Sequence, residues 1–198
     1  MEMKSLKIKI LLIFLFIFYA ALLSAQDIQT LDHNRAKIQK QGMIVLGTWA
    51  TINLISSPLF SMRETAVKKH FHQMNGYWNA VNLLIATGGY VMTQEFLHPE
   101  LSEVLLEQSK MEKILLFNAA LDIGYMVGGA YLIERAKNDL KRAEQLKGFG
   151  QSIILQGGFL FLFDIIMYRQ MHRNHIEILN LTDNTVLSFS GSGITLFF

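Results

Sequence analysis

The chain has 198 residues, of which 51% are hydrophobic and 17% are charged, and its formal net charge is +2. The charged share lies below the ~25% usual for soluble domains, as expected of a protein whose largest surface faces lipid. A net charge this small, with no basic cluster carrying interleaved aromatic residues, gives no indication of a nucleic-acid partner, and we expect none. The sequence contains no cysteine, which excludes disulfides, thiolate metal sites and a lipoprotein anchor.

Residues 1–25 have the layout of a secretory signal peptide. Three lysines among the first nine residues precede the apolar core 10–23, which is followed by the small residues Ser24 and Ala25. The core is short for a membrane span, which needs about 20 residues. We therefore expect cleavage after Ala25; the alternative, an uncleaved anchor, would leave the later segments in the same orientation.

A short polar segment, 26–41, leads into four stretches of mostly apolar residues. The four stretches are 42–60, 76–93, 114–133 and 149–168. Each is close to the length that a helix needs to cross ~30 Å of hydrocarbon. Because lipid offers no hydrogen-bond partner to exposed backbone, such segments form helices that pack together. The sequence predicts an all-α membrane protein, with a four-transmembrane-helix bundle in a single domain, 42–174.

The connections between the apolar stretches differ in charge. The first contains Arg63, Lys68 and Lys69, and the third contains five basic residues between 134 and 147, whereas the second is rich in glutamate. The positive-inside rule places the first and third connections in the cytoplasm. We therefore expect a protein of the bacterial inner membrane with both mature termini on the periplasmic side.

Two further segments lie outside the predicted spans. Residues 99–113 place apolar side chains near helical spacing, which predicts an amphipathic helix on the outer surface or on the mouth of the bundle. The tail, 175–198, shows alternation and turn residues, which predict a short β-hairpin. Because so small a unit is not stable alone, we expect it to pack on the bundle or on an envelope protein partner.

Every apolar stretch contains an amide or a carboxylate near its middle. The predicted polar membrane layer comprises Asn53, Asn79, Asn82, Asn118, Asp122, Gln156 and Asp164. An ionised aspartate at the centre of a span costs roughly 2.5–3.5 kcal/mol, and no lysine or arginine lies within a stretch to neutralise it. Two interpretations follow: hydrogen bonds that hold the helices together, or a proton- or cation-linked site formed by Asp122 and Asp164.

The spacing of small and polar residues predicts faces for helix packing. A heptad-like stripe follows the second stretch and consists of Asn75, Asn79, Asn82, Ala86, Gly89 and Thr93. Gly124 and Gly128 form a GxxxG pair, and Gly157-Gly158 gives the fourth stretch a small surface.

The histidines lie outside the apolar stretches, which argues against a haem held by two axial histidines. His172 and His175, with Glu177, have the chemistry to hold a metal at the outer surface, but such groups beside a membrane are usually only solvated. No metalloprotease, phosphate-loop, nucleophile-elbow or dinucleotide motif occurs. We expect no cofactor, no metal and no catalytic residue.

Three segments resemble a known family: 71–82 (FHQMNGYWNAVN), 112–136 (EKILLFNAALDIGYMVGGAYLIERA) and 148–164 (GFGQSIILQGGFLFLFD). They are similar to a family of small four-span membrane proteins from Bacteroidetes-type bacteria, a domain of unknown function. The resemblance covers roughly 42–168 and implies a location and a helix count, but no reaction. Its pattern includes Asn75, Asn79, Asn82, Asn118, Asp122, Gln156 and Asp164.

These observations favour a non-enzymatic structural or interaction subunit of the inner membrane, in contact with lipid. The alternative is a small transport or sensing module that binds a proton, a cation or a solute at the polar layer.

Overall fold

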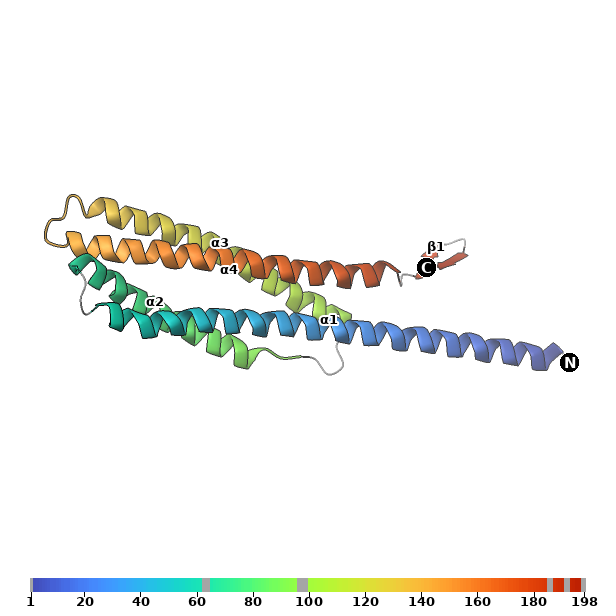
Figure 1. Cartoon of the computed structure of the whole chain (residues 1–198). Helices are drawn as coiled ribbons and strands as arrows, with labels where there is room; N and C mark the ends of the chain where they lie inside the picture. Colours follow the sequence, from blue (N-terminus) through green and yellow to red (C-terminus); the bar gives the residue numbers. More distant parts are fainter. Residues whose placement is uncertain (1, 62–64, 96–99, 185–186, 191–192, 197–198) are drawn as a thin grey trace.

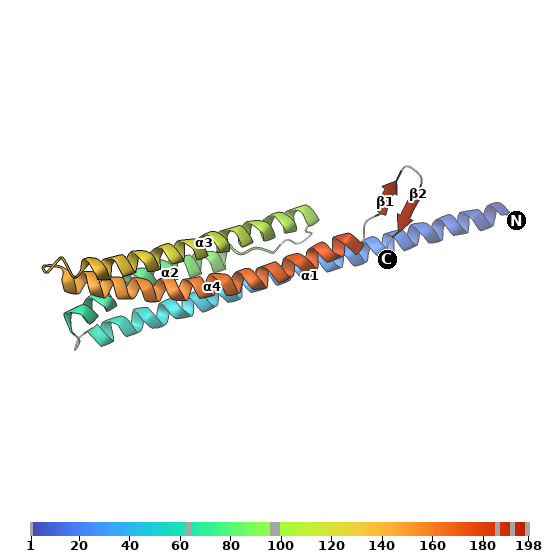
Figure 2. The same ribbon diagram turned by 90° about the horizontal axis from the view of Figure 1, so that it is seen from above.

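The computed structural model describes residues 2–61, 65–95, 100–184, 187–190 and 193–196. Over these residues the chain forms four antiparallel helices: α1 (Glu2–Ser61), α2 (Ala66–Met92), α3 (Leu101–Arg135) and α4 (Ala143–Asn184) (Figure 1). Two short strands, β1 (Leu187–Ser190) and β2 (Gly193–Leu196), pair in antiparallel fashion after α4. The amino-terminal part of α1 extends beyond the other helices (Figure 2).

The helices form two antiparallel pairs, α1 with α2 and α3 with α4. The pairs are joined mainly through α2 and α4, and α1 also packs on α4. The backbones of α2 and α3, in contrast, do not pack on each other. The α2 and α3 helices thus flank α4 on different sides, and this arrangement positions the site described below.

Buried residues recur every seven positions along both α3 and α4. On α3 they are Gln108, Leu115, Asp122 and Gly129; on α4 they are Gly150, Gly157, Asp164, Met171 and Ile178. A repeat of seven keeps one face of a helix against its partner when the two helices coil gently around each other. Because the helices are antiparallel, each step of seven down α3 is matched by a step of seven up α4.

The backbones of α3 and α4 approach each other closely at Gly129 and Gly150. A Cβ added to Gly129 would lie 2.7 Å from the backbone oxygen of Gly150, and one added to Gly150 would lie 2.5 Å from that of Gly129. A Cβ on Gly157 would lie 3.0 Å from the backbone oxygen of Asp122. Glycine is therefore required where the two backbones meet.

The predicted GxxxG contact is wrong. A Cβ added to Gly124 or Gly128 would meet nothing within 4 Å, so these glycines lie on the outer surface of α3. The physical reason is angular: Gly129, one position further along the helix, belongs to the seven-residue repeat that faces α4, and Gly128 does not.

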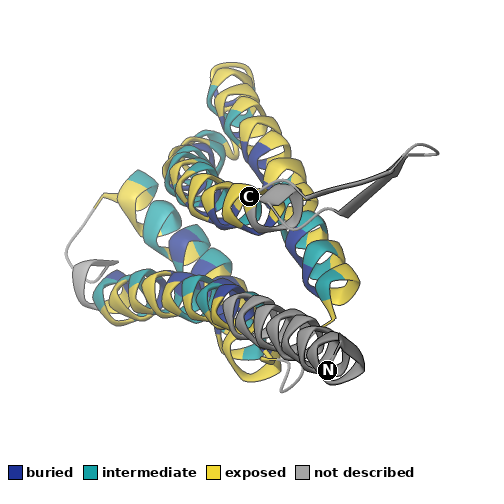
Figure 3. Cartoon of the chain, turned by 90° about the vertical axis from the view of Figure 1, so that its right-hand side faces the viewer, coloured by how far each residue is buried: buried dark blue, intermediate teal, exposed yellow. Residues whose placement is uncertain are grey.

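Exposed positions cover the outer faces of the helices, and buried positions face their interior (Figure 3). Many of the exposed side chains are large and apolar, whereas many of the buried ones are polar. Leu84 and Val91 of α2 are each 74% exposed, and Phe117 and Val127 of α3 are each 65% exposed. Apolar surface this extensive is unusual for a soluble monomer and marks a surface that is covered by lipid or protein.

The prediction of four membrane spans is wrong. Among the described residues, only two segments are long and apolar enough to cross a membrane: α3 over Leu101–Arg135 and α4 over Ala143–Asn180. Polar residues interrupt the other two helices: Asn53, Ser56 and Ser57 in α1, which also contains Pro58, and Asn75, Asn79 and Asn82 in α2. These side chains reduce the mean hydropathy of the two helices.

The predicted extent of the β tail, 175–198, is also wrong, because α4 continues to Asn184; the described residues beyond it form two paired strands of four residues each. The helix persists because Ile178, 1% exposed, continues the seven-residue repeat and packs with Leu31 and Val104.

The amphipathic segment 99–113 is not a separate helix; from Leu101 it forms the first turns of α3. Similarly, 26–41 lies within the continuous α1, and cleavage after Ala25 stays a prediction.

Candidate functional site

The residues of the predicted polar layer divide into two groups. Asn53, Asn79 and Gln156 join a hydrogen-bonded network between α1, α2 and α4. The other four, Asn82, Asn118, Asp122 and Asp164, line a cavity. The single layer expected from the sequence is therefore two distinct sites.

Asn75 of α2 is the centre of the network. Its Nδ2 donates to Asn53 Oδ1 and to Ser57 Oγ, both at 2.9 Å. Its Oδ1 accepts a short hydrogen bond from Gln156 Nε2 of α4. One amide therefore links three helices, and all of its hydrogen-bonding groups are used.

Trp49 closes the network on the α1 side. Its indole N–H donates to Gln156 Oε1 at 3.0 Å, and its ring stacks on Phe159 with centroids 3.9 Å apart. Sequence analysis missed Trp49 and Ser57. Both are four residues from Asn53, so the helical spacing of Trp49, Asn53 and Ser57 was the signal that could have found them.

The cavity has a volume of about 660 Å³. Its walls are mainly apolar residues of α2 and α3, the two helices whose backbones do not pack together, and α1 and α4 complete it. Trp78 of α2 and Tyr125 of α3 both line it and touch edge to face, with ring centroids 4.9 Å apart. This contact bridges the gap between α2 and α3.

Asp122 and Asp164 are the charged residues of the cavity wall within the described part of the chain. They are 3% and 5% exposed, and their carboxyl groups lie close to each other. Two ionised carboxylates offer only acceptors, so a direct hydrogen bond between them requires a proton on one of the two. Gly157 permits the arrangement, because it brings the backbone of α4 against that of α3 at Asp122.

Two buried polar atoms of the cavity residues have no hydrogen-bond partner among the described residues: Asp122 Oδ2 and Asn82 Nδ2. Asn82 is 3% exposed and Asn118 is half-buried. An unsatisfied buried polar group costs about 1–3 kcal/mol, so such atoms are rarely retained without a role. Asp122 Oδ2 is an acceptor and Asn82 Nδ2 is a donor. A ligand that carries both a donor and an acceptor could therefore bond to the two atoms.

Polar contacts at the far end of the bundle anchor the residues that follow α2. Glu95 accepts from His33 Nδ1 at 2.9 Å and pairs with Lys40, and Arg35 donates to the backbone oxygen of Gln94 at 2.9 Å. The hydrogen bond with His33 holds the pKa of Glu95 below its ordinary value. This cluster is exposed at Glu95 and separate from the cavity.

Comparison with known proteins identifies a domain family but no activity. A family of unknown function, DUF6992, matches residues 45–165, a segment that includes Asn53, Asn75, Asp122, Gln156 and Asp164. Searches of curated proteins and of solved structures returned no match. The matched segment spans more than half of the chain, and the protein belongs to the DUF6992 family.

Proposed function

We propose that this protein is a membrane-embedded binding module whose cavity takes a small amphiphile with a protonated amine. The observation that carries the proposal is the buried Asp122–Asp164 pair, with an unpartnered oxygen, in the wall of a large and mainly apolar cavity. It favours the solute-binding alternative over a purely structural subunit, whose polar residues would be expected to satisfy one another.

The chemistry of the cavity defines the ligand class. Its volume falls within the ~300–1,000 Å³ typical of ligand pockets, and a few polar groups among apolar walls are the usual means of orienting a ligand. An amine supplies the N–H donors and the positive charge that Asp122 and Asp164 lack, since neither lysine nor arginine of the described residues lines the cavity. The apolar walls suit a hydrocarbon body.

Access is proposed to be lateral, from the lipid between α2 and α3. The two backbones do not pack together, and the side chains that border the gap are exposed and apolar, including Val81, Ile85 and Leu121. Asp122 Oδ2 is itself covered, but rotation about χ2, which is soft for aspartate, turns an oxygen toward the cavity.

The membrane placement proposed here rests on α3 and α4, the two helices with sufficient apolar length. Their connection, 136–142, carries three basic residues, so it belongs in the cytoplasm of a bacterial cell, with the start of α3 on the periplasmic side. Because the chain has no cysteine, Ser102→Cys and Leu140→Cys give clean single labels. In intact cells, an impermeant thiol reagent should label residue 102 and spare residue 140; the reverse pattern would contradict this orientation.

Binding is tested with three probes of equal chain length: n-octylamine, 1-octanol and octanoate. Octylamine should raise the melting temperature of the detergent-purified protein more than the other two, because ligand binding to the folded state stabilises it. The Asp122→Asn/Asp164→Asn double variant should lose this difference.

Asp139→Asn is the matched control, since it changes an aspartate in the α3–α4 connection, which pairs with Arg142. It should respond to octylamine as the wild type does. Equal stabilisation by octanoate, or an undiminished octylamine effect in the double variant, would overturn the proposal.

A further inference from the structure

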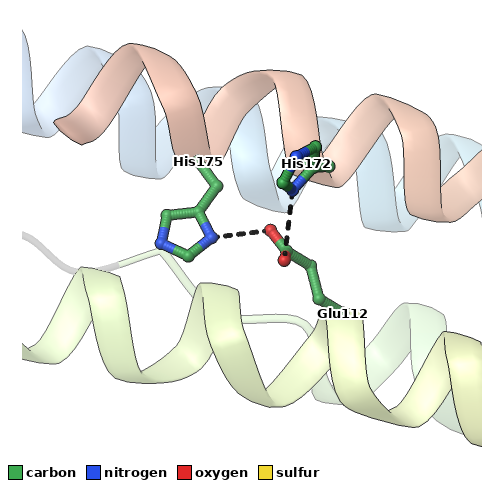
Figure 4. Close-up of side chains that lie close together, drawn as sticks. All are labelled: Glu112, His172 and His175. Atoms are coloured by element: carbon green, nitrogen blue, oxygen red, sulfur yellow. Dashed lines mark hydrogen bonds and ion pairs between the residues drawn. The ribbon is translucent and has the colours of Figure 1, made fainter. Parts of the chain in front are cut away.

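Three side chains that could share a metal ion meet between α3 and α4 (Figure 4). Glu112 projects from α3, and His172 and His175, three residues apart, project from the facing side of α4. His175 Nδ1 lies 2.8 Å from Glu112 Oε1, and His172 Nδ1 lies 3.5 Å from Glu112 Oε2. The three ligand atoms lie within 4.8 Å of one another.

Neighbouring residues hold the three side chains in place. Gln108 Nε2 lies 3.4 Å from Glu112 Oε1 and also donates to the backbone oxygen of Met171. Asn174 donates to Gln108 Oε1 at 3.2 Å, and Tyr168 stacks on the His172 ring. Second shells of this kind fix the orientation of metal ligands.

Burial and charge distinguish this cluster from a solvated ion pair. The side chains of Glu112 and His175 are only 12% and 18% exposed, whereas that of His172 is 47% exposed. Within the described residues, the ion pairs of Glu112 are with these two histidines and not with a lysine or arginine. The arrangement offers a shielded carboxylate, two imidazoles and an open side toward solvent.

We propose that Glu112, His172 and His175 form a site for a divalent transition-metal ion of the Zn²⁺ type. Two nitrogens and one oxygen are the donor set of many zinc sites that leave a fourth position open. Tetrahedral ligands at ~2.1 Å from the metal are about 3.4 Å apart. The 3.5 Å between His172 Nδ1 and Glu112 Oε2 matches this spacing, whereas the 2.8 Å between His175 Nδ1 and Glu112 Oε1 would have to lengthen as a metal enters. Moving the Nδ1 proton of each neutral imidazole to Nε2 frees the nitrogen that faces Glu112.

Sequence reasoning paired the two histidines with Glu177 instead. Glu177 neighbours His175 in sequence, but the structure brings Glu112 from 60 residues away into hydrogen-bonding range. His172 and His175 also lie beyond residues 45–165, the segment that matches the family. The metal site is therefore independent of the proposed function of the cavity.

The test is titration of the detergent-purified, tag-free and chelator-treated chain with Zn²⁺ alone, followed by calorimetry. The wild type should bind one equivalent, and His175→Ala and Glu112→Gln should each weaken binding by at least about tenfold. Co²⁺ substituted at the site should give the visible absorption of a four-coordinate ion with nitrogen and oxygen ligands, and this absorption should vanish in His172→Ala.

His33→Ala is the matched control, because His33 also bonds a glutamate, Glu95, but belongs to no such cluster. It should bind Zn²⁺ as the wild type does. Metal-free melting temperatures establish that the variants fold, and Glu112→Gln preserves side-chain shape if the alanine variants do not fold. Wild-type affinity no greater than that of folded Glu112→Gln, or an equal loss in His33→Ala, would overturn the proposal.

Discussion

The hydrogen-bonded network around Asn75 and the carboxyl pair of Asp122 and Asp164 contain similar side chains but differ in how fully their polar atoms are used. Around Asn75, the donors and acceptors of three helices are matched, except that Asn79 Oδ1 has no partner among the described residues. At the cavity, Asp122 Oδ2 and Asn82 Nδ2 are left without partners in the described structure. Polar residues within one bundle thus serve two purposes: satisfied groups stabilise the packing, and unsatisfied groups remain available to a ligand.

The largest expected effect is on the network. Asn75→Leu should lower the free energy of unfolding by roughly 2–4 kcal/mol, because Gln156, Asn53 and Ser57 each lose a partner and an unsatisfied buried group costs about 1–3 kcal/mol. Unfolding in mixed detergent micelles measures it. Gln73→Leu, at an exposed position of the same helix, is the control and should cost far less. Equal losses in the two variants would mean that the network is not stabilising.

A smaller loss is expected from Trp49→Phe. This change removes the N–H that donates to Gln156 but keeps a ring to stack on Phe159. One interhelical hydrogen bond in a membrane bundle is worth about 0.6–1.7 kcal/mol, and the same unfolding assay should detect that loss. Trp78→Phe, whose ring contacts Tyr125, is the matched control. If Trp78→Phe lowered the free energy of unfolding more than Trp49→Phe does, the cavity contact would stabilise the protein more than the network hydrogen bond, contrary to our expectation.

Asp122→Asn should change stability by less than about 1 kcal/mol, well below the effect of Asn75→Leu. The amide keeps the shape of the carboxyl group and donates to Asp164 in place of the shared proton. Measured beside the octylamine response, this variant separates folding from binding. A loss of stability as large as that of Asn75→Leu would make the carboxyl pair part of the structural framework.

The smallest effect is expected at the exposed Glu95 cluster. Because the pKa of Glu95 is lowered from its ordinary value of 4.5, its contribution to stability is present above that pH and is lost as pH falls through the lower, folded-state pKa. Glu95→Gln should therefore reduce stability slightly at pH 7 and flatten the decline below pH ~4.5 in a series of melting temperatures. Glu103→Gln, an exposed residue of α3, should leave the pH profile unchanged.

Sequence periodicity identified the residues that face the interior of α2 but not their partners. In the predicted stripe, Asn75, Asn79, Asn82, Ala86 and Thr93 are buried, because a heptad fixes one face of a helix. Their positions near the middle of the apolar stretches also grouped Asn53 with Gln156, and these two residues do join one network. A position along a stretch does not tell which way a side chain points around the helix axis, so Asp122 was grouped with them although it lies outside this network.

The sequence did not predict which residues of distant segments contact each other. The seven-residue repeat of α4, from Gly150 to Ile178, was visible in the sequence, yet the choice between Gly128 and Gly129 on α3 depends on the rotation of the partner helix. Similarly, the alternation after His175 predicted strands, whereas burial of Ile178 against Leu31 and Val104 stabilises helix there. Tertiary packing overrode local pattern in this segment.

Because α4 is one uninterrupted helix, a small change in its tilt at one point would become a larger displacement at its end. Asp164 lies 20 residues before the end of the helix at Asn184, a distance of about 30 Å at 1.5 Å per residue. A tilt of about 5° at Asp164 therefore displaces the end of α4 by roughly 2.6 Å. Met171 and Ile178, however, pack this part of α4 against α3 and α1, so a tilt of that size would first have to break these contacts. The same packing therefore holds His172 and His175 in position opposite Glu112.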